Sequence, residues 1–542
     1  MRQTRDEITD NLAERLCWQV AHRDDGRVAR RLYRKQVVDG VYRLDTGAVL
    51  DDFFHFLRAL GVMALLEQLR GTATDRVMVP FVQYALLYGL KTLFGIERIK
   101  ALPALLCSDE ALMRLVGFNA QQVRQGVCQR GRTTRQGERP RGPICPDTLA
   151  NNMVQCHLRD LETLFNGVIQ ALAKAGVFGK RVTGVADGTD LETTDRYHGC
   201  GQVTRKRHLV DKRGQGHEIE VTVYGWKALL LIDAVTKIPL AVKVGPIQAH
   251  ETLWTRALVT QARANLAGSA CLYKVVFDQG FLAGTDLGWL EQQGIRFVVP
   301  AKDHMAVTAD ARALAAAGEG VIVGRRVHTV RHGQGRTAYR ERLETEVVGI
   351  TGLTTYAPYG TEEHGRHPHR RDFEPNPINA VVVRKWNGKD YGPGGKTVFL
   401  TNASVQQPLQ PCDDDDDRRL IEHCCIREAK QPWDLKHPPQ KTARAVRVHV
   451  TFTLLLFALA TAYRLQGERA ALGVEPVGWQ RWRRQLQEQN RDKVIVFARG
   501  YYGIFHVAEY SLLLGAKLKD VPPGIGTLPE ILARYQLTAD NA

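Results

Sequence analysis

The sequence lacks the features of a secreted or membrane-spanning protein. Its ten cysteines include no CxxC pair, and the adjacent Cys424 and Cys425 are poorly placed for a disulfide with each other. The first ten residues carry charges from the start, so we expect no signal peptide. The longest apolar run, 448–463, contains His449 and several threonines, which favours a buried helix over a membrane span. We therefore expect a cytoplasmic protein in a reducing environment, with no membrane partner.

The composition is that of a folded, basic protein. The 542 residues are 44% hydrophobic and 24% charged, which is typical of globular chains. Lys and Arg number 74 against 58 Asp and Glu, which gives a net charge of +16. Such an excess indicates a polyanionic partner, and nucleic acid is the first candidate. The alternative is a basic enzyme that has no such partner.

The N-terminal third is predicted to be helical. Apolar residues recur at helical spacing between 50 and 116, and a further helix is expected over 147–175. Between these helices, arginines lie among Gly, Thr, Gln and Pro, which is typical of an exposed loop suited to phosphates. The candidate DNA-binding residues of this loop are Arg130, Arg132 and Arg135. An ordinary solvated linker would have the same composition.

Residues 180–302 alternate between strand-like and helix-like patterns. A strand is expected to end at Asp187, and a polar, basic loop over 205–213 follows it. Two strands then form a hairpin over 218–244, and helix, strand, helix and strand follow up to residue 300. The resulting order, β-β-β-α-β-α-β, is that of the ribonuclease-H-like fold.

The pattern changes again toward the C-terminus. Short alternating runs with glycine breaks predict a β-rich insertion, and the five acids 413–417 are interpreted as the solvated N-terminus of a helix. The expected fold class is α/β: a ribonuclease-H-like core interrupted by the insertion, with a helical N-terminal domain and a helical C-terminal tail. The predicted domains are 1–178 (helical, DNA-end-binding), 179–302 (first part of the core), 303–410 (insertion), 411–465 (last part of the core) and 466–542 (basic helical tail).

Two aspartates carry most of the chemical information. Asp187 closes the apolar run that starts at Arg181, and Asp278 closes the run that starts at Tyr273. A carboxylate at the end of a buried strand is costly unless it is paired or holds a metal. Phosphodiester cleavage needs stabilisation of charge on the attacking and the leaving oxygen, and two carboxylate-bound Mg²⁺ ions provide it. We therefore predict two Mg²⁺ ions, with Mn²⁺ as a substitute, held by these aspartates and a third acid from a later helix.

At these residues the chain resembles the DDE transposases of bacterial insertion sequences, specifically insertion-sequence family 4. The resemblance covers about 180–440 and rests on Asp187-Gly-Thr-Asp, on Phe277-Asp278-Gln-Gly-Phe281 and on the late helix. It implies metal-dependent cleavage at terminal inverted repeats, strand transfer into target DNA and a dimeric synaptic complex. It also implies a bacterial, nucleoid-associated location.

The late-helix signature of that family points to the third acid. The signature is Tyr, two residues, Arg, three residues, Glu, six residues, Lys. Arg418 and Glu422 match its middle, but Asp415 stands at the Tyr position and Ala429 at the Lys position, with Lys430 one step further. The predicted catalytic and metal-binding acids are thus Asp187, Asp278 and Glu422.

Glu428 is the alternative third acid. It lies six residues after Glu422, so the two side chains would point to roughly opposite sides of a helix and only one can face the metals. The family signature favours Glu422.

Three further residues are candidates for contact with DNA. Arg418 would contact phosphate or orient Glu422, and an ordinary salt bridge is the alternative. Lys430 would line the DNA path, unless it is simply solvated. Trp386, in the insertion, would stack on a flipped base, as the family can do; a purely structural Trp is the alternative.

Three other functions stay open at this point. One is a transposase-derived DNA-binding protein that no longer cleaves, which the departures at Asp415 and Ala429 allow. Another is a ribonuclease-H-like nuclease without strand transfer. A metallohydrolase acting on small phosphoesters is disfavoured by the positive charge.

Overall fold

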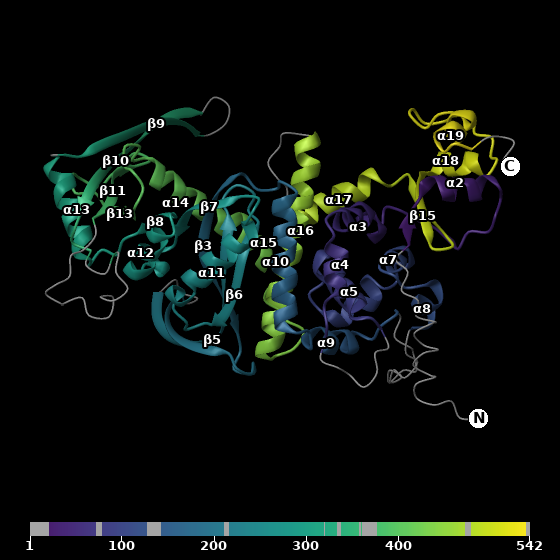
Figure 1. Cartoon of the computed structure of the whole chain (residues 1–542), viewed down its shortest axis with the longest axis horizontal. Coiled ribbons are helices and arrows are strands. Elements are labelled where there is room, and N and C mark those ends of the chain that lie inside the picture. The colour runs from purple at the N-terminus through teal and green to yellow at the C-terminus, as the bar shows by residue number, and fades with distance from the viewer. Residues whose placement is uncertain are drawn as a thin grey trace. The chain divides into compact units, whose positions relative to one another are not determined.

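The computed structural model describes residues 21–71, 79–126, 142–210, 216–318, 320–332, 338–356, 359, 377–471 and 478–537. The chain divides into two compact units. Unit 1 combines Met1–Phe165 with Gln431–Ala542, and unit 2 is Asn166–Lys430. Both contain helices and strands, so the α/β prediction is confirmed (Figure 1).

Unit 2 is built on an 11-stranded sheet. Its main path runs β4-β5-β3-β7-β8-β13-β11-β10-β9, while β6 pairs with β5 and β12 pairs with β11. The strands are β3 (Arg181–Thr193), β4 (Gly201–Val210), β5 (Gly216–Asp233), β6 (Pro239–Pro246), β7 (Cys271–Phe277), β8 (Arg296–Pro300), β9 (Ile322–His332), β10 (Tyr339–Leu353), β11 (Ile378–Trp386), β12 (Lys389–Asp390) and β13 (Thr397–Thr401).

Strand β3 lies inside this sheet, as the sequence predicts. It pairs antiparallel with β5 and parallel with β7. Val185 and Ala186 are almost completely buried, as expected of β-sheet residues covered on both faces. Because parallel neighbours end at the same edge of a sheet, the acid that follows β7 comes to lie beside β3.

Helices pack against this sheet, and one of them is the late helix α14. α11 contacts β5, β6 and β7, and α14 contacts β7, β8 and β13. The helices in or entering unit 2 are α10 (Leu158–Lys174), α11 (Thr255–Leu266), α12 (Gly284–Gln292), α13 (Ala306–Ala317), α14 (Gln410–Ile421) and α15 (Arg427–Lys430), with a π-helical segment at Glu422–Ile426 and 3-10 turns at Glu251–Trp254 and Gln279–Phe281.

Two local predictions in unit 2 are wrong. The expected basic loop over 205–213 is largely strand β4, which pairs with β5 along its whole length. Asp187 does not end its strand, because β3 continues to Thr193 opposite the long β5. In both places the pairing partner, rather than the local composition, decides the backbone. The strands expected in the insertion are present and continue the same sheet through the pairing of β13 with β8.

Unit 1 combines a helical part with a small sheet. Its long helix α16 contacts α3, α5 and α9. By length and composition the stretch Ala443–Gln466 of α16 is the one helix among the described residues able to cross a membrane, and 89% of its most apolar window is buried inside the protein. That burial agrees with the buried helix expected there. The helices are α2 (Asp25–Tyr33), α3 (Asp51–Ala59), α4 (Val62–Glu67), α5 (Phe81–Leu93), α6 (Leu102–Leu105), α7 (Glu110–Leu115), α8 (Ala120–Gln125), α9 (Pro146–Val154), α16 (Ala443–Ala471), α17 (Trp479–Gln489), α18 (Val507–Leu513) and α19 (Leu528–Arg534), with 3-10 turns at Gly47–Leu50 and Ile99–Ala101.

The prediction of an all-helical tail is wrong for residues 493–506. β14 (Lys493–Ala498) and β15 (Tyr501–His506) form a hairpin, and β1 (His22–Arg23) and β2 (Gly40–Arg43) complete a four-stranded sheet in the order β1-β15-β14-β2. The two turn residues, Arg499 and Gly500, both have positive φ, as a tight two-residue hairpin requires. The helical N-terminal part therefore also carries two short strands.

Candidate active site

Asp187 occupies a buried position in the middle of β3. Asp187 is only 6% exposed. The Gly188 N–H donates to Asp187 Oδ1 at 2.7 Å. Asp187 Oδ2 is buried and accepts no hydrogen bond from any part of the chain that the structure describes. An unpartnered buried carboxylate oxygen is unusual and calls for a ligand.

Asp278 follows β7 and lies beside Asp187, as the sequence predicts. Its backbone N–H donates to the Ala186 carbonyl at 3.3 Å, which extends the β3–β7 pairing by one residue. Its carboxylate caps the turn Gln279–Phe281 by accepting from Gly280 N at 3.4 Å. The side chain is 44% exposed, so this acid faces an accessible edge.

The late helix brings Glu422 and Arg418 to the same place. Arg418 lies in the last turn of α14, and Glu422 opens the π-helical segment that follows. Arg418 Nη1 lies 3.3 Å from Asp278 Oδ1 and 3.4 Å from Glu422 Oε1. One guanidinium thus joins acids from two distant parts of the chain. A π-helical segment at this point is notable because such segments recur at functional sites.

Asp415, which stands at the Tyr position of the family signature, holds Arg418 in place. It is 3% exposed, and its Oδ1 accepts from Arg418 Nε at 2.9 Å. Arg419 pairs with its other oxygen at 3.0 Å. The departure from the signature therefore has a structural consequence: a carboxylate replaces the aromatic ring and fixes the arginine that reaches Asp278 and Glu422.

The interpretation of residues 413–417 as a solvated helix start is wrong for two of the five acids, Asp414 and Asp415, which are buried. Helix α14 begins earlier, at Gln410, so these acids lie within it. Asp414 is 5% exposed and accepts from Lys274 Nζ at 2.6 and 2.7 Å. Asp413 pairs with Arg326 at 2.6 Å. Together with Asp415, these acids anchor α14 to neighbouring elements of unit 2.

The electrostatics of the cluster centre on Asp187. Burial raises the pKa of Asp187 to about 7 from its ordinary 3.8, and the charges of Asp278 and Glu422 add to the increase. The Gly188 hydrogen bond and Arg418 act in the opposite direction. Burial also disfavours the charge of Arg418, but its hydrogen bond to Asp415 and the nearby acids raise its pKa above the ordinary value. The site is therefore an acidic cluster stabilised by one internal cation.

The donor atoms suit a hard divalent cation. They are carboxylate oxygens, which Mg²⁺ prefers, and Asp187 Oδ2 is left without a partner. Within the described residues, however, no three Asp, Glu, His or Cys side chains are already grouped closely enough to share an ion. The acids instead meet through Arg418. The donor atoms therefore suit Mg²⁺, and in this structure the guanidinium of Arg418 supplies the positive charge beside Asp278 and Glu422.

The contacts favour Glu422 over Glu428 as the third acid. Glu422 pairs with Arg418 and raises the pKa of Asp187. Glu428 lies in α15, on the far side of the π-helical segment. Burial raises the pKa of the Cys425 thiol, and the charge of Glu428 adds to that increase. Ala429, at the Lys position of the signature, is completely buried, whereas Lys430 is partly exposed.

A fourth acid, which the sequence analysis did not single out, lies beside the cluster. A Cβ placed on Gly280 would come within 3.1 Å of Glu251 Oε2, and one on Gly188 within 3.7 Å of Glu251 Cγ. Lys227 Nζ lies 2.5 Å from Glu251 Oε1 and, although burial acts the other way, lowers its pKa. No motif marks Glu251 in the sequence. It lies in the 3-10 turn Glu251–Trp254, and only the folding of the chain brings that turn beside Gly188 and Gly280.

Trp386 lines a small cavity next to the cluster. The cavity holds about 200 Å³. Asp415 and Arg419 of α14 form one wall, and Trp386, Tyr391 and Lys396 are among the other lining residues. The other DNA-binding candidates, Arg130, Arg132 and Arg135, lie outside the described residues.

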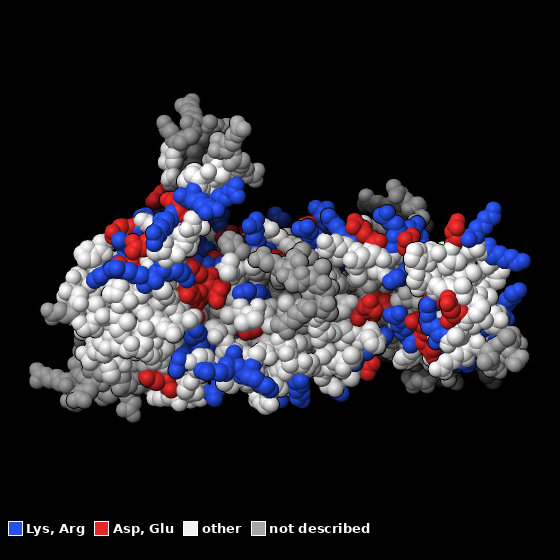
Figure 2. All heavy atoms as spheres, turned by 90° about the horizontal axis from the view of Figure 1, so that it is seen from above, with Lys and Arg blue, Asp and Glu red and all other residues white. Residues whose placement is uncertain are grey.

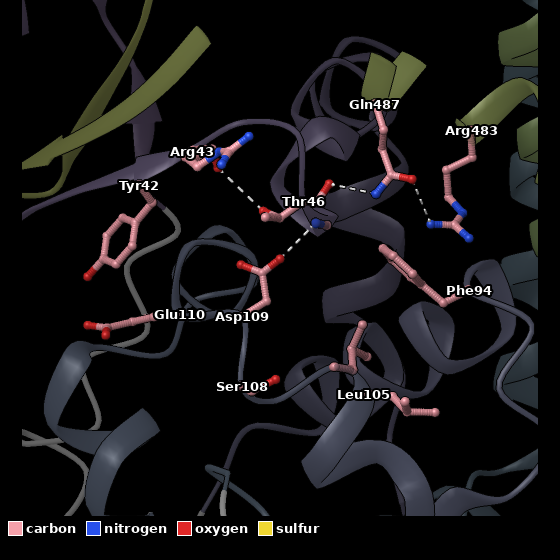
Figure 3. Close-up of a pocket in the computed structure, with 12 residues that line it drawn as sticks. Tyr42, Arg43, Thr46, Phe94, Leu105, Ser108, Asp109, Glu110, Arg483 and Gln487 are labelled. Atoms are coloured by element: carbon pink, nitrogen blue, oxygen red, sulfur yellow. Dashed lines mark hydrogen bonds between the residues drawn. The ribbon is translucent and has the colours of Figure 1, made fainter. Parts of the chain in front are cut away.

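A larger hollow of about 720 Å³ lies in unit 1 (Figure 3). Its main acid, Asp109, accepts from Gly47 N at 2.7 Å and from Leu112 N at 3.0 Å. Gln487 donates to the Thr46 carbonyl at 3.3 Å. These polar groups serve backbone capping, so we assign this hollow a structural role.

Comparison with known proteins gives a family match for part of the chain. Residues 179–405 match the protein-family model described as "Transposase DDE domain". The matched segment contains Asp187 and Asp278 and ends before the helix that carries Glu422. No curated protein matches the chain.

The match supports a DDE transposase, an enzyme class whose substrate is DNA and whose members generally use divalent metals. The match thus supports the predictions of a transposase and of a mixed α/β domain consistent with one.

Proposed function

We propose that this protein is a cut-and-paste DNA transposase of the insertion-sequence family 4 type, from a bacterial insertion sequence. The observation that carries the proposal is the convergence of Asp187, Asp278 and Glu422, from β3, β7 and the end of α14, around Arg418. The family match supports it independently, because it covers the first two acids without using the third.

The sheet order supports a ribonuclease-H-like core. β6, β5, β3, β7 and β8 are neighbours in that order, with β3 and β7 parallel. Counted in chain order without β4, which lies between β3 and β5 in the sequence, this is 3-2-1-4-5, the arrangement expected of that fold. The acids then lie at the edge of the two central parallel strands, where open α/β sheets place their ligands.

The chain's own residues prepare the reacting site. Asp187, Asp278 and Glu422 would hold two Mg²⁺ ions, with Mn²⁺ as a substitute, and these ions would stabilise charge on the attacking and leaving oxygens. Asp187 is oriented by the Gly188 N–H. Arg418, fixed by Asp415, can exchange its acidic partners for a phosphate oxygen, since arginine binds both groups in the same planar geometry.

The proposed substrate is double-stranded DNA carrying the terminal inverted repeats, followed by target DNA. Figure 2 shows Lys and Arg side chains in several separate groups on the visible face, with acids between them, rather than in one continuous patch. We propose that Arg418, Lys430 and the loop arginines Arg130, Arg132 and Arg135 contact phosphates. The cavity at Trp386 has an aromatic wall suited to a flipped base.

The assembly and the location follow from the same proposal. Two copies would form a synaptic complex that holds both ends of the element. The protein would act in the bacterial cytoplasm at the nucleoid.

A cleavage assay with labelled DNA carrying the flanking inverted repeat tests the proposal. Wild type should cleave in the presence of Mg²⁺ and join the freed 3′ end to target DNA. Asp187→Ala and Glu422→Ala should bind without cleaving, and Glu428→Ala serves as the matched control that keeps activity. Loss with Glu428→Ala and retention with Glu422→Ala would move the third acid to 428.

Two other outcomes identify the alternatives. Binding without cleavage by wild type would indicate an inactivated descendant of a transposase. Cleavage without a joined product would indicate a nuclease.

A further inference from the structure

The β9–β10 hairpin forms a two-stranded ribbon with a concentrated positive face. From Glu346 to Leu353, β10 also pairs with β11, but its residues 339–345 pair with β9 alone among the described strands. Three exposed arginines lie on one face of this outer part: Arg331, Arg340 and Arg342. β9 is the last strand of the sheet order, so the ribbon lies at the edge of the sheet (Figure 1).

The pairing register sets like charges against each other. Arg331 lies directly opposite Arg340, and Arg342 lies opposite Thr329, one diagonal step from Arg331. Directly opposite side chains start about 5 Å apart, and like charges there are destabilising. A fold tolerates such a pair most readily when an anion binds to it.

The nearby acids already have other partners. Glu344 pairs with Lys385 at 3.2 Å, and Glu346 pairs with Arg325 at 2.7 Å. Glu341 points to the other face, where it pairs with His332 at 2.8 Å. In the sequence, residues 333–337 between the two strands include no acid. None of the acids in the described part of the chain forms an ion pair with the three arginines.

The β4–β5 ribbon, at the opposite end of the sheet order, provides a contrast. Its residues Arg205 and Arg207 were expected to lie in a polar, basic loop, but they lie in strand β4 and each has an acidic partner. Arg205 pairs with Asp190, and Arg207 pairs with Glu192 at 2.6 Å. Both ribbons carry several Lys and Arg residues, but among those that the structure describes only the three arginines of the β9–β10 face have no acidic partner.

We propose that the β9–β10 ribbon binds the DNA backbone through Arg331, Arg340 and Arg342. The inference rests on the proposed function, because the partner it names is the substrate of that function. A two-stranded ribbon has the width that the major groove admits. Arg340 and Arg342 are two residues apart, about 6.8 Å along a strand, which is close to the rise of two nucleotides on one DNA strand, also about 6.8 Å.

The salt dependence of DNA binding tests this assignment. Each phosphate contact contributes about 0.9 to the slope of log K against log salt, so Arg331→Gln/Arg340→Gln/Arg342→Gln should flatten the slope by about 2.7. Between 50 and 200 mM salt, wild-type affinity for a duplex should then fall about 40-fold more than that of the triple variant. The control Arg205→Gln/Arg207→Gln removes two similar charges and should leave the slope unchanged.

A second variant separates binding from structure. Arg340→Glu places an acid opposite Arg331, so its thermal midpoint should hold or rise while its DNA affinity falls. A falling midpoint would mean that the arginines serve the fold or guard the sheet edge, and would overturn the inference.

The outcomes also distinguish the two proposals. The ribbon assignment alone is overturned if wild type binds DNA and the triple variant has the same salt slope as wild type. It is also overturned if the control variant flattens the slope as much as the triple variant does. Wild type that binds no DNA overturns the proposed function and this inference with it.

Discussion

Replacing Asp187 with asparagine should stabilise the metal-free protein at alkaline pH. The folded protein holds the Asp187 proton with a pKa of about 7, against 3.8 in an ordinary carboxyl, because the group is buried. Since the folded state binds this proton more tightly than the unfolded state, stability falls as pH rises from about 4 to 7. The full difference corresponds to about 4 kcal/mol of unfolding free energy.

The pH dependence makes the prediction specific. At pH 5 somewhat more than half of this stabilisation is still present in wild type, and the remaining part, about 2–3 kcal/mol, is lost between pH 5 and pH 8. Asp187→Asn carries no titrating group there, so its advantage over wild type should grow by that amount between the two pH values. Asn can still accept the Gly188 N–H through its oxygen.

Thermal unfolding of the full chain at pH 5 and pH 8 measures this difference. For a unit the size of Asn166–Lys430, about 2–3 kcal/mol corresponds to a change of about 4–5 °C in the midpoint. Asp278→Asn is the matched control, because that side chain is 44% exposed and should change the midpoint little. Millimolar Mg²⁺ should raise the wild-type midpoint at pH 8 and not that of Asp187→Asn.

Two results would refute the reasoning. An advantage of Asp187→Asn that is equal at both pH values would show that Asp187 does not carry the burial penalty. A variant that is less stable than wild type at both values would show that its carboxylate is satisfied in the fold.

Three further predictions concern buried polar groups. Asp415→Ala should cost about 1.5–3 kcal/mol in urea unfolding, because Arg418 loses its buried partner; wild-type stability would contradict that role. Lys274→Met should destabilise by about 3–5 kcal/mol by leaving Asp414 buried and unpaired, and adding Asp414→Leu should restore most of the loss. Additive losses in the double variant would show that the two residues do not act as a pair. Burial lowers the pKa of His449 to about 3 from 6.5, so stability should fall by about 5 kcal/mol in total as pH decreases through that range. His449→Gln should flatten the acid side of the thermal-midpoint profile, and an unchanged profile would exclude His449 as the cause.

The sequence predicted the neighbourhood of Asp187 and Asp278 because both follow apolar runs of the kind that form buried strands. Such runs are local, so period and residue type suffice to locate them. The same reasoning failed at residues 201–210, where basic and polar residues form β4. There the pairing with β5 and the ion pairs to Asp190 and Glu192 stabilise the strand. None of these partners is visible in the local pattern.

The acidic run 413–417 shows the same limit for charges. As a sequence, five acids favour a solvated helix end, since isolated carboxylates are costly to bury. In the structure Asp414 and Asp415 are buried because Lys274 and Arg418 meet them. Lys274 is 140 residues away in the chain, so only the packing of α14 against β7 brings it to Asp414.

The sequence by itself determined the α/β class, the two strand acids and the late Arg418–Glu422 helix, because periodicity and short spacings are local properties. The tertiary structure decided how these parts meet. It joined Asp278 and Glu422 through one arginine, left Asp187 Oδ2 without a partner, and set Arg331 against Arg340. Each of these depends on strand register or on helix packing across long separations, and such contacts form only when the whole sheet is assembled.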